Sequence, residues 1–458
     1  MVMLSFFSAL VGTVLTPAML FAASAGILAT AGIRQIFDLR PLFRGKEQRK
    51  AGTSPFTALS LALAGTLGVG NITGVASAMT AGGPGAVFWM WIGALAAVPV
   101  KYAEVRLAVR YRERTSEGWR GGAMYVIRDG FGGTRAACWL AALFAVLCAA
   151  NALVTGNLIQ SNAAVSLLPQ DRRMLWGLLL SVLVALSVCF GTRHIERVAA
   201  RLMPALTAFY ITVCFLAILP RAAMLPGILS TIVRAAFSVR AFGGGMLGFS
   251  MREALRFGIM RGIFSNEAGC GTSPTAHAAA DTDSEHNQAL LGVCEVIFDT
   301  LILCTLSALV LLTADGVGGV IPWHGLGDAA PVVMDAFRLL CGSRLSAGVR
   351  IATVLFAYAS IIAQIYYGLT AVGFLSEKKT AGRLFLALSV LMPLFGAAVS
   401  PGVMWLAADL LLGSMTVLNC AVLLLLRGNL RPFPPRSPYS RPAACSARPA
   451  RRRDGTRP

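Results

Sequence analysis

Charged residues are scarce in this chain. Only 13% of its 458 residues are charged, whereas 56% are hydrophobic and the mean hydropathy is +0.69. A soluble globular domain has about 25% charged residues. The composition therefore excludes a soluble fold and indicates an all-α, polytopic membrane protein in a lipid bilayer.

The sequence also lacks the residue spacings that metal or nucleophilic chemistry needs. It has no HExxH motif and no CxxC pair, and its ten cysteines are scattered singly. His277 has no second His or Cys at ligand spacing, so we interpret it as a hydrogen-bonded helix residue rather than a metal ligand. No nucleophile and base stand in a recognisable motif, and we predict that the protein is not an enzyme.

The net charge of +19 comes from basic residues in loops and in the tail. The positive-inside rule explains this distribution, so we predict no nucleic-acid partner. The rule places the N-terminus outside and the C-terminus in the cytoplasm of a multi-pass protein of the cell membrane, which we take to be a monomer. The predicted inner segments are 34–50, 101–120, 193–201, 377–383 and the tail, while the acidic loop 281–286 is the exception.

Eleven apolar stretches are long enough to cross a hydrocarbon core of about 30 Å. The first, 4–31, has neither a basic start nor a small-residue cleavage site, so we expect it to stay as a membrane span. The eleven stretches are 4–31, 55–78, 83–108, 136–165, 174–191, 200–220, 245–280, 288–314, 346–372, 383–399 and 402–426.

Two of these stretches contain short polar interruptions, Gly65–Gly74 and Phe264–Thr272. If the first span is set aside, ten remain in two groups of five, and each group opens with an interrupted stretch. This pattern is typical of an inverted repeat whose discontinuous helices form a site in the middle of the membrane. We therefore predict an N-terminal helix (1–32), a transport core (33–426, with repeats 55–220 and 245–426) and a disordered basic tail (427–458).

The first interruption carries four glycines, which lower helix stability and expose the backbone to a ligand, together with Asn71. The broken helix would offer amide groups to a carboxylate and carbonyl groups to a cation. Close helix packing through Gly70 and Gly74 is the alternative.

The second interruption contains Glu267, an ionisable residue at membrane depth. It would neutralise a cation, carry a proton or anchor a helix end. The alternative is a structural ion pair with Arg256 or Arg261.

Other polar residues stand inside the predicted spans. Asn157 and Gln160 share a helix face and would either face the interruptions or hydrogen-bond to another helix. Glu295 and Asp299 also share a face, suited to a water-lined path or to a Lys or Arg partner. The sequence predicts Lys101 and Glu104 to form an interfacial ion pair of little energetic weight.

Six segments form a recognisable set: GTLGVGNITGVA at 65–76, GGPGAVFWMW at 82–91, KYAE at 101–104, GGAMY at 121–125, RGIFSNEAG at 261–269 and AHAAA at 276–280. Together they resemble the alanine or glycine:cation symporter family, also called the sodium:alanine symporter family. The similarity runs from about residue 4 to residue 426.

The resemblance implies a LeuT-type 5+5 inverted repeat with one extra N-terminal helix. It implies a secondary active symporter of small neutral amino acids, alanine or glycine, driven by the sodium gradient through alternating access. The substrate residues that it implies are Asn71, Thr73, Gly74, Gln160, Phe264, Ser265 and Gln364. Sodium would bind near Gly68, Asn71 and Ser360, with Glu267, Glu295 and Asp299 as coupling or structural carboxylates.

The chain departs from the family pattern at two positions. Ala359 replaces a hydroxyl ligand, and Gln364 replaces a pocket Trp. A lost oxygen ligand should weaken sodium binding, and an amide in place of an aromatic wall should make the pocket more polar. Proton coupling through Glu267 or Glu295, and a non-transporting sensor or channel on the same fold, are therefore the alternatives.

Overall fold

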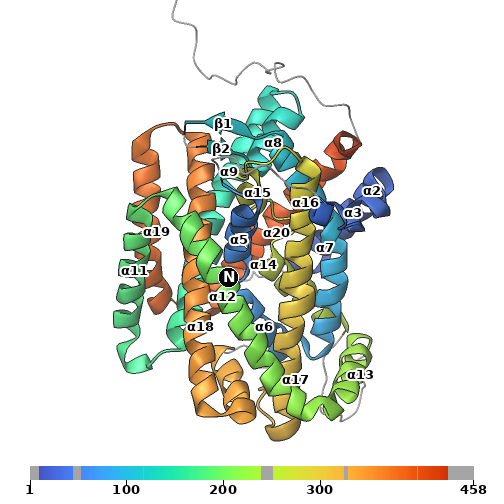
Figure 1. Cartoon of the computed structure of the whole chain (residues 1–458), viewed down its shortest axis with the longest axis vertical. Helices are drawn as coiled ribbons and strands as arrows, with labels where there is room; N and C mark the ends of the chain where they lie inside the picture. The colour runs from blue at the N-terminus through green and yellow to red at the C-terminus, as the bar shows by residue number, and fades with distance from the viewer. Residues whose placement is uncertain are drawn as a thin grey trace, which may run out of the picture.

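The computed structural model describes residues 10–44, 53–116, 118–238, 251–323, 329–399 and 401–431. The predicted tail, apart from its first five residues, and the start of the first span lie outside these residues. In the described part, helices form one bundle and a two-stranded hairpin lies at one end of it (Figure 1).

Nine helical stretches of the described chain are long and apolar enough to cross a membrane. Together with the two interrupted segments they correspond to the eleven predicted stretches. The nine are η1 (Val11–Leu15) with α2 (Thr16–Ala31), α7 (Gly85–Arg110), α9 (Arg135–Leu153) with η3 (Val154–Ile159) and α10 (Gln160–Ser166), η4 (Gln170–Arg172) with α11 (Arg173–Cys189), α12 (Thr192–Ile218) with η5 (Leu219–Met224) and α13 (Leu225–Ala236), α16 (Glu285–Val296) with η6 (Ile297–Cys304) and α17 (Thr305–Gly318), α18 (Ala330–Leu375), α19 (Lys379–Ala398), and α20 (Pro401–Leu426) with η7 (Arg427–Leu430).

Both predicted interruptions are real breaks in helices. In the first, α5 (Pro55–Thr66) ends before the single 3-10 turn η2 (Val69–Asn71), and α6 (Thr73–Gly82) follows. In the second, α14 (Met251–Asn266) and α15 (Pro274–Ala278) are separated by an irregular segment. That segment contains Glu267, Gly269 and Gly271, all with positive φ (50°, 88° and 76°), a backbone conformation that ends a right-handed helix.

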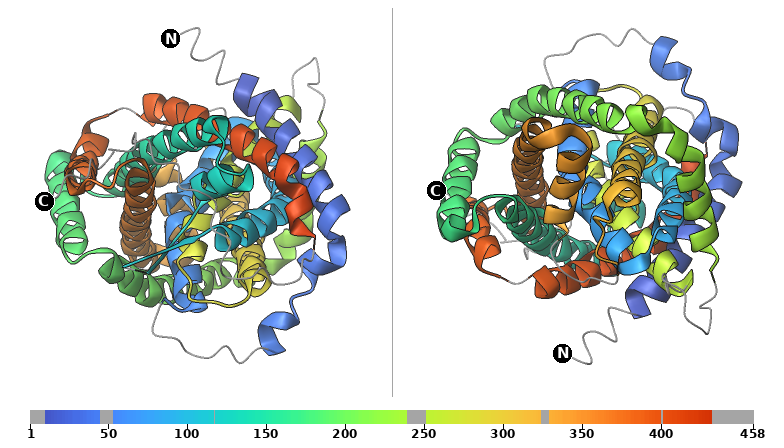
Figure 2. Two further views of the ribbon diagram at one scale, coloured as in Figure 1. Left: turned by 90° about the horizontal axis from the view of Figure 1, so that it is seen from above. Right: turned by 90° about the horizontal axis from the view of Figure 1, so that it is seen from below.

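Figure 1 shows α5, α6 and α14 in the middle of the bundle, with α18 on one side and α7 and α16 on the other. The contacts agree, because α14 packs on α6 and α7, while α5 packs on α12 and α18. The end-on views of Figure 2 show the remaining helices as a ring around this centre. The breaks are thereby shielded by protein, as irregular backbone at membrane depth must be.

Smaller elements lie at the ends of the spans. The strands β1 (Glu113–Thr115) and β2 (Gly118–Arg120) pair antiparallel and precede α8 (Ala123–Gly130), while α3 (Ile33–Phe37) and α4 (Pro41–Arg44) follow the first span. None of these was predicted, because they are too short to form an apolar stretch that crosses a membrane.

The ninth predicted stretch, 346–372, is part of a longer helix. α18 begins at Ala330 and bends at Gly342, where φ is +81°. The first part of this helix contains the charged residues Asp335 and Arg338, so it did not appear as part of an apolar stretch in the sequence.

Candidate functional site

The first break meets a side chain of α10. The Val69 amide donates a hydrogen bond to Gln160 Oε1 at 2.9 Å, and both residues are buried. A Cβ on Gly68 would lie 2.5 Å from the same oxygen, so only glycine lets the amide side chain approach this closely. Gln160 therefore faces the break and also hydrogen-bonds to another helical segment, which agrees with both alternatives considered for it. Asn157 instead donates to the Ala152 carbonyl within its own segment at 2.7 Å.

Asn71 connects the first break to η6. Its Nδ2 donates to Asp299 Oδ1 at 2.8 Å and to the Asp299 carbonyl at 3.1 Å, and its own carbonyl accepts from Ser307 Oγ at 2.6 Å. Asn71 Oδ1 is buried and has no hydrogen-bond partner among the described residues. A buried amide oxygen without a donor is costly unless a ligand completes it.

Asp299 connects the second break to the same point. Its Oδ2 accepts from Ser265 Oγ at 2.7 Å and from Thr300 Oγ1 at 2.9 Å, and the residue is fully buried. η6 is a π-helical segment, a distortion that occurs often at functional sites. One carboxylate therefore joins Asn71 of the first break to Ser265 of the second.

Phe264 covers this junction with an aromatic ring. A Cβ on Gly70 would lie 3.0 Å from Phe264 Cδ1, and the nearest Phe264 atom to Gly74 would be 3.9 Å from its added Cβ. The ring packs edge-on against Trp405 at a centroid distance of 4.8 Å. Thr73, also buried, turns its hydroxyl to the Val69 carbonyl at 3.0 Å.

Among the described residues Glu267 has no arginine partner, so the ion pair with Arg256 or Arg261 considered as an alternative is wrong. Its carboxylate accepts from Thr272 Oγ1 and from Gln364 Nε2, each at 2.5 Å. Arg261 instead pairs with Asp409 at 2.9 Å and lies over the Trp405 ring. The reason is geometric: Glu267 has left-handed backbone geometry at the end of α14, whereas Arg261 belongs to the regular helix.

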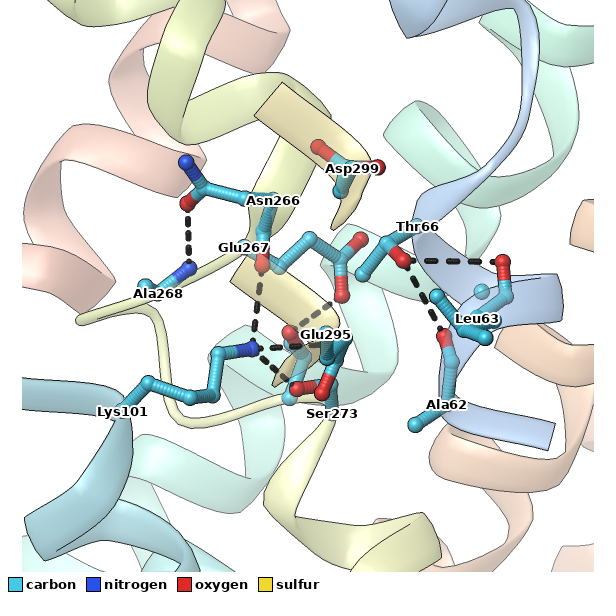
Figure 3. A network of polar contacts seen from close by, with 12 residues as sticks. Ala62, Leu63, Thr66, Lys101, Asn266, Glu267, Ala268, Ser273, Glu295 and Asp299 are labelled. Carbon is cyan, nitrogen blue, oxygen red and sulfur yellow. Dashed lines mark hydrogen bonds and ion pairs between the residues drawn. The ribbon is translucent and has the colours of Figure 1, made fainter. Parts of the chain in front are cut away.

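The predicted interfacial pair of Lys101 and Glu104 is also wrong. Lys101 is fully buried, and its Nζ lies 3.3 Å from Glu295 Oε1 in a polar network beside the second break (Figure 3). His277 contacts Glu295 Oε2 at 2.9 Å and Gln288 at 2.8 Å, which confirms it as a hydrogen-bonded helix residue. Lys101 was predicted to lie at the membrane interface because the sequence does not show which helices surround α7.

Ser360 and Gln364 meet α5 rather than Gly68. Ser360 Oγ donates to the Gly65 carbonyl at 3.1 Å, and Gln364 Nε2 lies 3.5 Å from the same oxygen. Ala359, next to Ser360, is fully buried. The carbonyl and hydroxyl oxygens here are ligands of the kind that a hard cation prefers.

Three groups that contact the predicted site residues were not themselves predicted: the Gly65 carbonyl, Ser307 and Trp405. Ser307 could have been found as a polar residue inside the predicted span 288–314 that already contained Glu295 and Asp299. Trp405 offers no comparable signal, since its contact with Phe264 depends on tertiary packing.

A cavity of about 1470 Å³ opens at the hairpin end of the bundle. It extends inward to Tyr366, two residues from Gln364 on α18. Burial lowers the pKa of Arg112 in its wall to about 10, so this guanidinium stays charged at neutral pH. The basic residues of the wall are Arg112, Arg114, Arg120, Arg193, Arg197, Lys378, Lys379 and Arg383, against Glu196, Asp281, Asp283 and Glu377.

Residues 2–432 match the sodium:alanine symporter family. The chain belongs to this family. Its members are transporters, and the chain is accordingly a sodium-coupled amino-acid symporter of the membrane and not an enzyme. The family resemblance expected from the sequence motifs is confirmed.

Two curated relatives of the family cover most of the chain. The probable sodium/glutamine symporter GlnT of Bacillus subtilis is 35% identical over 394 residues, covering 85% of this chain and 79% of the relative. The sodium/alanine symporter AgcS of Methanococcus maripaludis is 34% identical over 391 residues, covering 83% of each.

The fold matches that of a solved LeuT-type transporter. The crystal structure of MhsT in complex with L-phenylalanine superposes with a TM-score of 0.56 at 17% identity, covering 84% of this chain and 98% of MhsT. The predicted fold class is thus confirmed.

Proposed function

We propose that the chain carries a small neutral amino acid together with sodium by alternating access, and that both bind between the two breaks. The observation that supports this most is the buried chain of contacts from Asn71 through Asp299 to Ser265. It brings residues of both breaks to one point and leaves Asn71 Oδ1 without a partner in the described structure.

The substrate would lie against the residues implied by the family resemblance. Backbone amides at the start of α6, beside Thr73 and Gly74, suit a carboxylate, since a helix N-terminus favours negative charge. Phe264 and the small residues facing it would enclose a short apolar side chain. Gln160, Ser265 and Gln364 would complete the polar wall.

Sodium would take oxygen ligands from the first break and from α18. Ser360 Oγ and the Gly65 carbonyl already meet there, with Gly68 one turn further along the chain. Asn71 Oδ1 and Asp299 offer a second set of oxygen atoms beside the substrate. In both places the transported sodium ion would be bound by oxygen atoms, the ligands that a hard cation prefers.

Proton coupling is the second candidate. Glu267 and Asp299 are buried, and the hydrogen bonds described above come only from neutral donors. A buried carboxylate in such surroundings is stabilised either by a cation or by a proton. Glu295 is a weaker candidate because it contacts Lys101.

We also propose the orientation and organisation of the chain. The basic cavity at the hairpin end would face the cytoplasm by the positive-inside rule, which makes this an inward-facing arrangement with the N-terminus outside. The repeats 55–220 and 245–426, the basic tail 427–458, a monomer in the cell membrane and the absence of a nucleic-acid partner belong to the same proposal.

Uptake into proteoliposomes tests the function. Labelled alanine, glycine, serine and glutamine would be offered with an inward sodium gradient, with an inward proton gradient, or with neither. Sodium-driven uptake supports the proposal, whereas uptake that follows pH and ignores sodium supports proton coupling. Counterflow separates a carrier from a channel, because only a carrier exchanges internal for external solute.

A further inference from the structure

Two charged residues of α7 contact the second break. Lys101 and Glu104 stand one helical turn apart, and their exposed fractions are 0% and 3%. α7 packs along α14 and also contacts α15. Charges buried this deeply require specific partners.

Lys101 occupies the gap between the two helices of the break. Its Nζ donates to the carbonyl of Asn266, the last residue of α14, at 3.0 Å. It also donates to Oγ of Ser273, the residue before α15. Figure 3 shows the ammonium group reaching both, with Glu295 beside it. A positive charge at the C-terminal end of α14 also suits the helix dipole.

Glu104 binds a backbone amide of the break, whereas Lys101 binds a carbonyl. Its Oε1 accepts from the Gly271 amide at 2.9 Å and from Asn419 Nδ2 at 2.5 Å. Asn419 in turn donates to the Gly269 carbonyl at 2.9 Å. The Asn266 carbonyl at the break thus accepts a hydrogen bond from the Lys101 cation, and the Gly271 amide donates one to the Glu104 carboxylate.

The neighbouring helix α16 supports this arrangement. Glu295 holds Lys101 on one oxygen and His277 of α15 on the other. Gly292 allows the close approach, because a Cβ there would lie 2.7 Å from Val105 Cγ2 and 3.3 Å from Lys101 Cγ. α7, α15 and α16 are therefore joined around one ammonium group.

We propose that Lys101 and Glu104 are positioning residues of the transport cycle, which fix the second break from α7. Unpaired backbone groups at membrane depth cost several kcal/mol, and here the protein satisfies them with its own charges rather than with a ligand. The backbone on either side, which carries Phe264, Ser265 and Glu267, is thereby held toward the first break. α7 and α14–α15 then move as one unit.

This inference rests on the proposed function only where uptake is used to test it. The direct measurement is amide hydrogen exchange of the peptide covering residues 267–273 in the purified protein, which requires no substrate. We expect slow exchange in the wild type and exchange about tenfold faster or more in Lys101→Ala and Glu104→Ala, the effect of losing a charged hydrogen bond. Arg135→Ala, at an exposed basic residue at the start of α9, is the control and should match the wild type.

The transport readout distinguishes positioning from general destabilisation. Lys101→Ala should lower uptake about tenfold or more, and n-propylammonium, which replaces the missing part of the side chain, should restore it. Tetramethylammonium, which has no N–H group, should not. The Arg135→Ala control should respond to neither amine.

Glu104 provides the second variant if Lys101→Ala does not fold. Glu104→Ala should raise the KM for the amino acid about tenfold, while Glu104→Gln, which keeps an acceptor oxygen for Gly271, should stay near the wild-type value. Unchanged exchange of peptide 267–273 in Glu104→Ala overturns the inference. If the two variants exchange faster than the wild type but the wild type shows no uptake, the proposed function is overturned, whereas the positioning of the second break by α7 is supported.

Discussion

The Asp299 carboxylate accepts a hydrogen bond from the Asn71 amide at 2.8 Å, across 228 positions of sequence. Its other oxygen accepts from Ser265, so a single buried acid touches both broken helices. Because a charged group at this depth must be balanced, we expect a cation bound beside this acid to depend on the geometry of both breaks.

Asp299→Asn should reduce sodium-dependent uptake. The variant keeps the size of the side chain but loses its charge, and a hydrogen bond to a charged group is worth about 1.5–3 kcal/mol, roughly a tenfold effect or more. The half-saturating sodium concentration, measured in proteoliposomes, should rise accordingly. Asp335→Asn, at an exposed ion pair with Arg338, is the control. Equal sodium dependence in both variants contradicts a role for Asp299 in cation binding.

Gln364→Trp should narrow the range of substrates. The amide is buried, and it hydrogen-bonds Glu267 within the polar wall. An indole ring would remove this polar group and add bulk where Gln364 already packs closely on Gly156, whose added Cβ would meet Gln364 Cβ. We expect uptake of serine and glutamine to fall relative to alanine. Gln170→Trp, on an exposed turn, is the control. Unchanged ratios among the three substrates refute the idea that Gln364 admits a longer or more polar side chain.

The sequence predicted the breaks better than the contacts across them. Glycines and polar residues inside apolar stretches reveal where a helix is interrupted, and both α5–α6 and α14–α15 broke where expected. Gln160 lies opposite the first break, which was one of the two arrangements considered for its helix face. Such features are local, so a single chain shows them.

The partners of buried charges could not be predicted in the same way. Lys101 was assigned to Glu104 because the two are neighbours on one helix, yet it contacts Glu295, Asn266 and Ser273 from other elements. Arg261 likewise forms an ion pair with Asp409, which lies on α20. Which helices pack together decides these pairs, and hydropathy alone does not contain that information.

Gly68→Ala should weaken substrate binding without unfolding the protein. The added Cβ would lie 2.5 Å from Gln160 Oε1, and the flexible end of that side chain would move away. The Val69 amide then loses its acceptor, so the first break changes shape. We expect the KM for the amino acid to rise about tenfold. Thermal unfolding in detergent should shift little. Gly227→Ala, with no atom within 4 Å of its Cβ, is the control. A normal KM in Gly68→Ala contradicts the assignment of Gln160 to the site.

Ala359→Ser should strengthen sodium binding. Ala359 is fully buried beside Ser360, whose hydroxyl meets the Gly65 carbonyl at 3.1 Å, so a second hydroxyl would be added next to oxygens already gathered there. Cation affinity rises with the number of oxygen ligands, and we expect the half-saturating sodium concentration to fall about three- to tenfold. Ala371→Ser, buried on the same helix three turns away, controls for the polarity of a new hydroxyl. If Ala359→Ser leaves sodium activation unchanged, then the ion does not bind at this point of α18, and the oxygens around Asn71 and Asp299 become the sole candidates within the described chain.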